Sequence, residues 1–280
     1  HDPASVLLLI NGASPASVQV GEHYAKLRGL PDGNVVRLDL PATDEVTREQ
    51  FVRAIETPLS RWFARHAAHD RILFIVLAKG VPLRVAGTTG RQGTVASVDS
   101  ELALLYRKMT GRPVAPAGPV PNPYFLGNAP LGDARPFSRE HHDIYLVTRL
   151  DGFTVEDAMA LAGRGRDAEA TAGAGLAPGR IGLDMKAAVA DPANEWLRAA
   201  ATRLGDMGLG DRVTLETTSA VLRDQGDLLG YYSWGSNDPS IRDRQLGLRF
   251  RPGGVAGQFV STDARTFVEP PADWTIGTWE

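Results

Sequence analysis

Short aliphatic runs alternate with amphipathic segments along this chain, and the alternation predicts strands followed by helices. Residues 6–10 form an unbroken aliphatic run, and residues 72–77 form the most hydrophobic one. A run without polar alternation is typical of a parallel strand that is covered on both faces. Further strands are predicted at residues 35–40, 145–148, 180–183, 213–216, 228–232 and 257–260.

Helix signals lie between these strands. Ser14 before Pro15 is typical of a helix N-terminus, and Gly29 ends the helical spacing that follows. Thr47 and Gln50 form a capping box ahead of a second helix. Later helices are predicted to begin at Thr154, with Asp157, and at Asp191, with Pro192. Strands that alternate with helices predict an α/β fold with a mostly parallel, doubly wound sheet and flanking helices, as one domain over residues 1–280.

A proline-rich insertion interrupts this rhythm at about residues 111–143. Seven of the 19 prolines lie there, which excludes a regular helix or a central strand. A long connection without its own secondary structure is usually a lid or a disordered linker. Because two aromatic residues lie in its middle, we expect an ordered lid over the strand ends, with Tyr124 or Phe125 buried.

Composition and charge exclude several classes of function. The formal net charge of -3 gives no global basic field for nucleic acid, and no apolar run approaches the roughly 20 residues of a membrane-spanning helix. The chain contains no cysteine, so disulfides, thiolate metal sites and a cysteine nucleophile are excluded. It begins His1-Asp2-Pro3 without methionine, so we expect that any signal peptide has already been removed, and this start neither shows nor excludes export.

Candidate chemistry gathers after the predicted strands, because ligands of open α/β sheets bind outside the carboxyl ends of the strands. We expect these side chains to line one cleft at one edge of a single sheet. The candidates for ligand binding are Lys79, Arg84, Arg149, Trp234, Ser236, Asn237 and Arg265. The candidates for catalysis are Asp99, Asp151, Asp238, Asp263 and Ser261.

Several of these residues also have a purely structural interpretation. Asp99 precedes a helical segment and is predicted to be its N-cap more readily than a catalytic group. Asp151 with Gly152 is a turn dipeptide, with which Arg149 could pair at the surface. Lys79 with Gly80 is interpreted equally well as the end of a strand or as part of a site.

Known sequence motifs fit the chain poorly. It contains no phosphate-binding loop, no dinucleotide fingerprint, no nucleophile elbow and no zinc-binding helix motif. His66 and His69, and the pair at 141–142, are interpreted as surface polar residues. Carboxylates could hold calcium or magnesium, but no EF-hand spacing organises them. We therefore expect no cofactor and no metal.

Five segments of the chain carry a resemblance to a known family. Residues 77–84 (LAKGVPLR), 97–102 (SVDSEL), 145–152 (YLVTRLDG), 231–238 (YYSWGSND) and 261–266 (STDART) together resemble an uncharacterised bacterial family whose members often carry an export signal. The resemblance covers nearly the whole chain. It implies an exported protein and names no activity.

A more distant similarity is to the gingipain-like and caspase-like peptidases. Trp234-Gly235-Ser236 occupies the place of a His-Gly-Ser element, and Ser261 lies near the expected cysteine. The similarity implies a caspase-hemoglobinase-like fold. Without the imidazole and the thiolate, the thiol mechanism of those peptidases is lost, and a serine without a matched base is a poor nucleophile.

Three functional hypotheses follow from the sequence. The first is an exported protein that binds a polar ligand, a glycan or another protein chain at the strand-end cleft. The second is a hydrolase that uses carboxylates, with or without a divalent cation, in the same cleft. The third is a structural protein of the cell surface. Carboxylates within about 5–10 Å of one another would favour catalysis, and dispersed ones would favour binding or structure.

Overall fold

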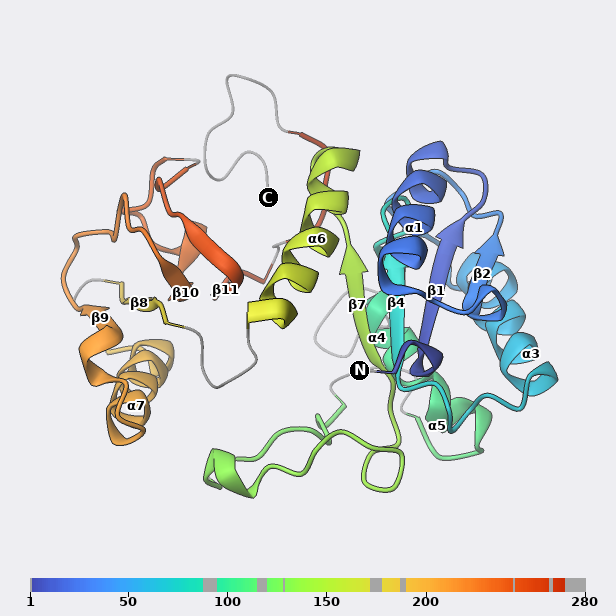
Figure 1. The fold of residues 1–280 in the computed structure, drawn as a ribbon, viewed down its shortest axis with the longest axis horizontal. Helices are drawn as coiled ribbons and strands as arrows, with labels where there is room; N and C mark the ends of the chain where they lie inside the picture. The colour runs from blue at the N-terminus through green and yellow to red at the C-terminus, as the bar shows by residue number, and fades with distance from the viewer. Residues whose placement is uncertain are drawn as a thin grey trace. The chain divides into compact units, whose positions relative to one another are not determined.

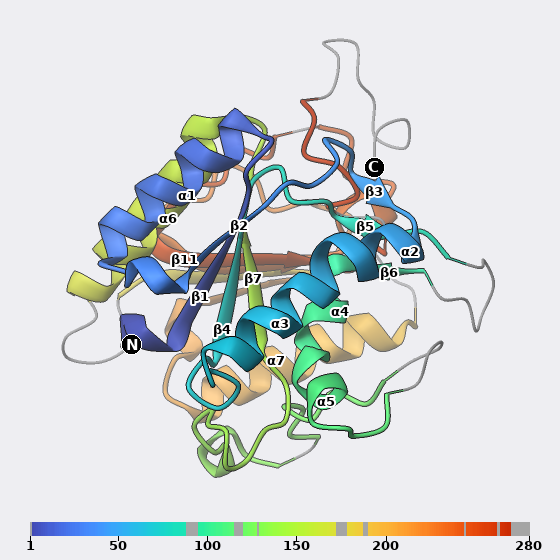
Figure 2. The same cartoon turned by 90° about the vertical axis from the view of Figure 1, so that its right-hand side faces the viewer.

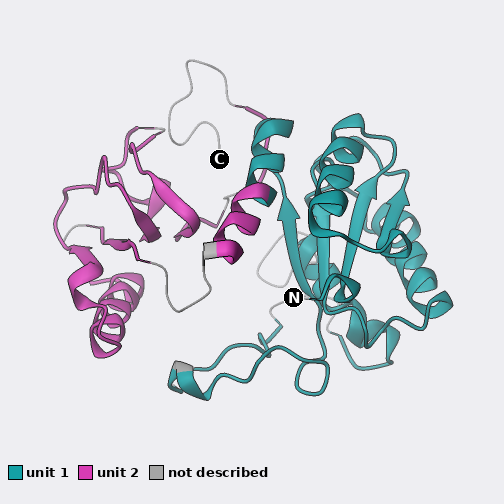
Figure 3. Ribbon diagram, in the orientation of Figure 1, with its two compact units in different colours: residues 1–162 teal, residues 163–280 magenta. Residues whose placement is uncertain are grey.

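The chain folds into two compact units, residues 1–162 and residues 163–280 (Figure 3). The computed structural model describes residues 2–87, 95–114, 120–127, 129–171, 178–186, 190–243, 245–261 and 264–269. Each unit contains its own four-stranded parallel sheet with helices. The α/β class and the parallel strands are therefore confirmed, whereas the prediction of a single sheet is wrong. Parallel runs look alike in sequence, and pairing between strands is decided by contacts that sequence patterns do not carry.

The sheet of unit 1 has the strand order β2-β1-β4-β7 (Figure 1). Its strands are β1 (Val6–Asn11), β2 (Val35–Leu38), β4 (Phe74–Ala78) and β7 (Leu146–Leu150). All six residues of β1 are buried, as expected for a central strand covered on both faces. The order places β1 and β4 in the middle, so the apolar runs predicted from the sequence form the centre of the sheet.

Helices cover both faces of this sheet (Figure 2). One face carries α1 (Pro15–Arg28) and α6 (Val155–Thr171), and the other carries α3 (Thr57–Arg65), α4 (Val98–Ala103) and α5 (Leu105–Met109). Helix α2 (Arg48–Phe51) continues into α3 through a π-helical turn (Val52–Glu56). Successive residues of β1 point to opposite faces, so Leu7 and Leu9 pack toward α3 while Leu8 and Ile10 pack toward α1. Unit 1 is thus a doubly wound, three-layer structure.

The helix caps in unit 1 follow the sequence with one exception. Ser14 accepts a hydrogen bond from the Ser17 N–H at 3.3 Å, and the Thr47–Gln50 capping box is present. Asp99, however, is not an N-cap. Ser97 caps α4 by accepting from the Ser100 N–H at 3.0 Å, which leaves the Asp99 side chain in the first helical turn. The expected cap was displaced because a serine two residues earlier satisfies the same helix end.

Unit 2 is built on a sheet of order β11-β10-β8-β9. Its strands are β8 (Arg180–Asp184), β9 (Val213–Glu216), β10 (Leu228–Ser233) and β11 (Phe250–Gln258). Helix α7 (Pro192–Asp206) packs on one face around Leu183 and Leu197, and an apolar cluster around Leu222 and Tyr231 covers the other. The prediction placed the last strand at 257–260, and β11 ends where that range begins. Pro252 and the glycines around it hid the strand, because an edge strand tolerates both residue types.

A three-stranded sheet and several short turns complete the described fold. The sheet contains β3 (Glu45–Val46), β5 (Arg84–Val85) and β6 (Ala96–Ser97), with β5 in the middle. Single 3₁₀ turns lie at Pro3–Ser5, Asp32–Asn34, Leu131–Asp133, Gly210–Arg212 and Gly235–Asn237.

The described part of the proline-rich insertion does not form the expected lid. Arg139 donates hydrogen bonds to the carbonyls of Ile72 and Ile144 at 2.9 and 2.8 Å, which ties the insertion to the amino ends of β4 and β7. Tyr124 and Phe125 are 44% and 76% exposed, so the prediction that one of them is buried is wrong. The insertion leads directly into the amino end of β7, and its anchor therefore lies opposite the edge at which the candidate groups gather.

Candidate functional site

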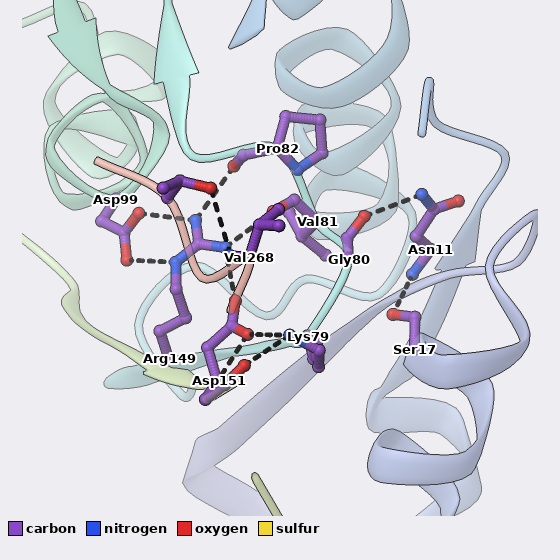
Figure 4. Close-up of polar contacts among 12 residues, drawn as sticks. Asn11, Ser17, Lys79, Gly80, Val81, Pro82, Asp99, Arg149, Asp151 and Val268 are labelled. Atoms are coloured by element: carbon purple, nitrogen blue, oxygen red, sulfur yellow. Dashed lines mark hydrogen bonds and ion pairs between the residues drawn. The ribbon is translucent and has the colours of Figure 1, made fainter. Parts of the chain in front are cut away.

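Four of the candidate residues meet at the carboxyl edge of the unit 1 sheet (Figure 4). Lys79 follows β4, Arg149 lies near the end of β7, and Asp151 comes directly after β7. Asp99 reaches the same place from the first turn of α4. The carboxyl ends of neighbouring parallel strands meet at one edge of a sheet, which is why residues so distant in sequence come together. We call these four residues the strand-end ion network.

Arg149 is the centre of the strand-end ion network. Its Nε and Nη2 donate to the two carboxylate oxygens of Asp99 at 3.2 and 2.7 Å. Its Nη1 and Nη2 also donate to the carbonyls of Val81 and Pro82 at 2.7 and 3.0 Å. The side chain is only 11% exposed. A planar guanidinium fits such a forked arrangement, and a lysine in its place could not satisfy these acceptors together.

Asp151 lies between the two cations of the network. Its Oδ1 accepts from the Lys79 ammonium at 3.0 Å and from the Gly152 N–H at 2.9 Å, and its Oδ2 lies 4.0 Å from Arg149 Nη1. Its side chain is 4% exposed. A buried carboxylate is tolerable only when it is paired and hydrogen-bonded, and Asp151 meets both conditions. The surface interpretation of the Arg149–Asp151 pair is therefore wrong.

Asn11 organises the loops beside the network and is not among the candidates predicted from the sequence. Its Nδ2 donates to the Gly80 carbonyl at 2.8 Å, and its Oδ1 accepts from the Leu40 N–H at 3.1 Å. Its own N–H donates to Ser17 Oγ at 2.9 Å. Asn11 thus joins the segments that follow β1, β2 and β4. The available sequence signal was a polar residue at the end of an aliphatic run, and the structure shows that Asn11 is fully buried.

A second ionic cluster includes Glu101 of the same helix, α4, and was not predicted from the sequence. Glu101 pairs with Arg48 at 2.7 Å and with Lys108 at 2.8 Å, and Lys108 also binds Glu56. Burial would raise the pKa of Glu101, but hydrogen bonds and charge from Lys108 and Arg48 outweigh it and hold that pKa below its usual value. Arg84, a further ligand candidate, pairs with Glu45 at 3.2 Å on the small sheet. These ion pairs do not include any member of the strand-end ion network.

The candidates that follow β10 belong to unit 2, not to the strand-end ion network. Trp234 is 8% exposed, and its Nε1 donates to Asn194 Oδ1 at 2.7 Å. The Lys186 ammonium lies 4.3 Å from the centre of its ring. Asp238 is 4% exposed and accepts from the Ser240 N–H at 2.8 Å. The remaining two candidates here are Ser236 and Asn237, in the 3₁₀ turn after β10. The prediction that all candidates follow strands of a single sheet is wrong because these strands form a second sheet.

Asp184, at the end of β8, is the most unusual acid of unit 2. It is 3% exposed, and its Oδ2 accepts from the Leu222 N–H at 3.0 Å and the Tyr231 hydroxyl at 2.9 Å. Its Oδ1 is buried without a hydrogen-bond partner among the described residues. Burial raises the pKa of Asp184, the two hydrogen bonds oppose that rise, and the charges of Asp238 and Glu216 add to it. Asp184 is not among the catalytic candidates predicted from the sequence, and its place directly after an apolar run was the available signal.

The remaining candidates lie after β11. Ser261 is exposed, and unit 2 contains no histidine and no cysteine in its sequence, so its own unit offers no imidazole base. Arg265 is also exposed, whereas Asp263 lies outside the described residues.

Among the described residues, no group of three or more histidines or carboxylates is placed to hold a metal ion. Within the same residues, the helices are too short or too polar to cross a membrane. The chain matches no family model, no curated protein and no solved structure.

Proposed function

We propose that this protein binds a neutral, hydroxyl-rich ligand, such as a sugar, at the strand-end ion network. The observation that carries the proposal is the convergence of Lys79, Arg149, Asp99 and Asp151 at the carboxyl edge of the unit 1 sheet. This edge is where ligands of doubly wound sheets bind. The resemblance to exported bacterial proteins supports placing this activity outside the cytoplasm.

The charge balance of the network favours a neutral ligand. Two cations face two carboxylates, so the network carries no net charge to attract an anion or a cation. Asp99 and Lys79 are its more accessible members, with side chains 29% and 18% exposed. A carboxylate accepts hydrogen bonds and an ammonium donates them. A hydroxyl group can satisfy both, because it is both a donor and an acceptor.

The pairing within the network argues for binding rather than catalysis. A general acid or base needs a group that can gain or release a proton near neutral pH. Asp151 and Asp99 instead accept hydrogen bonds from Lys79 and Arg149. These bonds occupy carboxylate oxygens that a catalytic acid or base would have to turn toward a substrate. The absence of cysteine from the chain also removes any thiol mechanism.

A titration followed by amide NMR tests this proposal. Glucose, mannose and N-acetylglucosamine are added to the full chain, with inorganic phosphate and arginine as charged probes. We expect a neutral sugar to shift the amide signals of Gly80, Val81 and Gly152, which border the network. Asp99→Asn should weaken that binding about tenfold, the effect of one lost charge-assisted hydrogen bond.

The matched control is Glu45→Gln, which removes the carboxylate partner of Arg84 elsewhere in unit 1. It should leave sugar binding unchanged. Binding of phosphate or arginine in preference to all three sugars would contradict the neutral-ligand proposal. Sugar binding that is equally strong in wild type and Asp99→Asn would place the ligand elsewhere.

A hydrolase remains the second candidate because of Asp184. A buried carboxyl with a raised pKa is the type of group that serves as a general acid. The test is release of p-nitrophenol from a panel of p-nitrophenyl glycosides and esters by the full chain. Turnover that disappears in Asp184→Asn would support this candidate, and turnover that survives the change would reject Asp184 as the acid.

A further inference from the structure

Unit 2 carries three neighbouring aromatic rings whose role the strand-end ion network does not explain. Trp196 of α7 and Tyr232 of β10 are 62% and 38% exposed. The Phe259 ring lies next to both, with ring centres 5.9 Å from Trp196 and 4.7 Å from Tyr232. We call these three residues the aromatic platform. Exposed aromatic residues that cluster in this way usually mark a binding surface.

The aromatic platform is exposed to solvent because β11, the strand beside Tyr232, carries mostly glycine and alanine there. Tyr232 is in register with Gly257 on β11, and its ring crosses the position that a side chain at 257 would occupy. A Cβ at Gly257 would lie 2.4 Å from Tyr232 Cε2. Val255, two residues earlier on β11, is 69% exposed. Helix α7 packs on β8 and β9. The Tyr232 ring of β10 and the Val255 side chain of β11 therefore remain exposed to solvent.

Contacts from Trp234 and Asn237 hold Phe259, the central residue of the platform, in place. Trp234 packs edge-on against Phe259 with ring centres 5.4 Å apart, and its Nε1 is fixed by Asn194. The Asn237 side chain donates to the Phe259 carbonyl, which fixes the backbone after β11. Phe259 is therefore positioned before a ligand binds, and the Trp196 and Tyr232 rings both lie against it. Preorganisation of this kind reduces the entropy lost on binding.

The extent and the chemistry of the surface favour a small ligand over a protein. A stable protein interface uses about 20–30 residues on each side. Here three rings and Val255 are flanked by Gly254, Ala256 and Gly257 of β11, which offer little further apolar area. The polar side chain of Asn237, in the turn after β10, lies beside Phe259. An apolar surface with polar groups at its border fits a ligand with both characters.

We infer that the aromatic platform binds an oligosaccharide. A pyranose ring has apolar C–H faces, which stack on the Trp196 and Tyr232 rings, and hydroxyl groups at its edge, which reach the polar border. This second sugar-binding surface goes beyond the proposed function, because it uses unit 2 alone and shares no residue with the strand-end ion network. Each surface is therefore tested by its own variants.

Isothermal titration calorimetry on the full chain tests the inference. The probes are cellohexaose, N-acetylchitohexaose, maltohexaose and mannohexaose. We expect at least one of them to bind with a Kd of about 1 mM or below. Trp196→Ala should weaken that binding about tenfold by removing one stacked ring. Gly257→Val should weaken it as well, because the new side chain displaces the Tyr232 ring.

Met207→Ala is the matched control, since Met207 is 58% exposed at the other end of α7. It should leave the affinity unchanged, and circular dichroism checks that each variant is folded. Failure of all four hexasaccharides to bind would overturn the inference. So would binding that is lost in Asp99→Asn and kept in Trp196→Ala, a result that would leave the proposed function standing. Concentration-dependent dimerisation that disappears in Trp196→Ala would show instead that a second copy of the chain covers the platform.

Discussion

The carboxyl ends of the two parallel sheets differ in the partners that they give a buried carboxyl group. In unit 1, Asp151 is 4% exposed and lies between two cations, with Lys79 at 3.0 Å. In unit 2, Asp184 is just as deeply buried, yet its partners are a backbone N–H and the Tyr231 hydroxyl. One sheet end holds charges that compensate each other, and the other holds an acid that burial pushes toward its neutral form.

The difference shows that the same position in a fold can serve two chemical purposes. Hydrogen bonds from Lys79 and Arg149 hold the carboxylates of Asp151 and Asp99 in position, which suits recognition of a polar ligand. A buried acid without a cation favours the protonated form, so its pKa is raised and ionisation at neutral pH costs stability. Loss of a charged partner should therefore lower the stability of unit 1, whereas loss of the Asp184 charge should raise the stability of unit 2 at neutral pH.

The largest effect is expected from Arg149→Met. This change leaves Asp99 without its cation and leaves the carbonyls of Val81 and Pro82 without donors. Breaking a buried pair by removing one partner costs about 3–5 kcal/mol of the free energy of unfolding. Urea denaturation measures the loss. Arg37→Met is the control, because its pair with Glu22 is about half exposed, and it should cost less than about 1 kcal/mol. Equal losses in the two variants would mean that the strand-end ion network does not stabilise unit 1.

A smaller effect is expected from Glu101→Gln in the second ionic cluster of unit 1. At pH 7 the change should cost about 1.5–3 kcal/mol, the range for hydrogen bonds to a charged group. Because the folded pKa of Glu101 lies below its usual value, the wild-type advantage is present at neutral pH and disappears as the pH falls through that folded pKa. Unfolding curves of both proteins between pH 7 and pH 3 measure the difference. Glu49→Gln, at a carboxylate whose side chain is 84% exposed, should show no such convergence.

The smallest effect, with the opposite sign, is expected from Asp184→Asn. The asparagine oxygen keeps the acceptor for Leu222 and Tyr231 and removes the buried charge. Because the folded pKa of Asp184 is raised, the wild type loses stability as the pH rises through the interval between the unfolded and folded pKa values. The variant should therefore become the more stable protein toward pH 8, by about 1 kcal/mol.

Thermal unfolding of both proteins from pH 4 to pH 8 measures this gain. Asp206→Asn, at an exposed carboxylate that ends α7, should follow the wild type throughout. A variant that is destabilised more strongly at high pH than at low pH would show that Asp184 is stabilised as a carboxylate, and the contrast between the two sheet ends would fail.

Strands and helix caps could be predicted from the sequence where they depend on residues next to one another in the chain. The strand at 213–216 and the caps at Ser14 and Thr47 are as predicted, because each depends on neighbouring residues. The prediction for β11 failed because proline and glycine hide an edge strand. The prediction of a lid failed for a different reason. Aromatic residues in a loop favour burial in general, but the Arg139 contacts place this loop at the other end of the sheet.

The sequence by itself determined the α/β class, the parallel character of the strands and the presence of ionisable groups at strand ends. These follow from apolar periodicity and from the position of polar residues after each run. Only the tertiary structure decided which groups meet. Arg149 and Asp99 are 50 residues apart and Lys79 and Asp151 are 72 apart, while Asp238 belongs to a different sheet. Strand pairing sets such contacts, and it depends on the packing of whole elements, which no local pattern encodes.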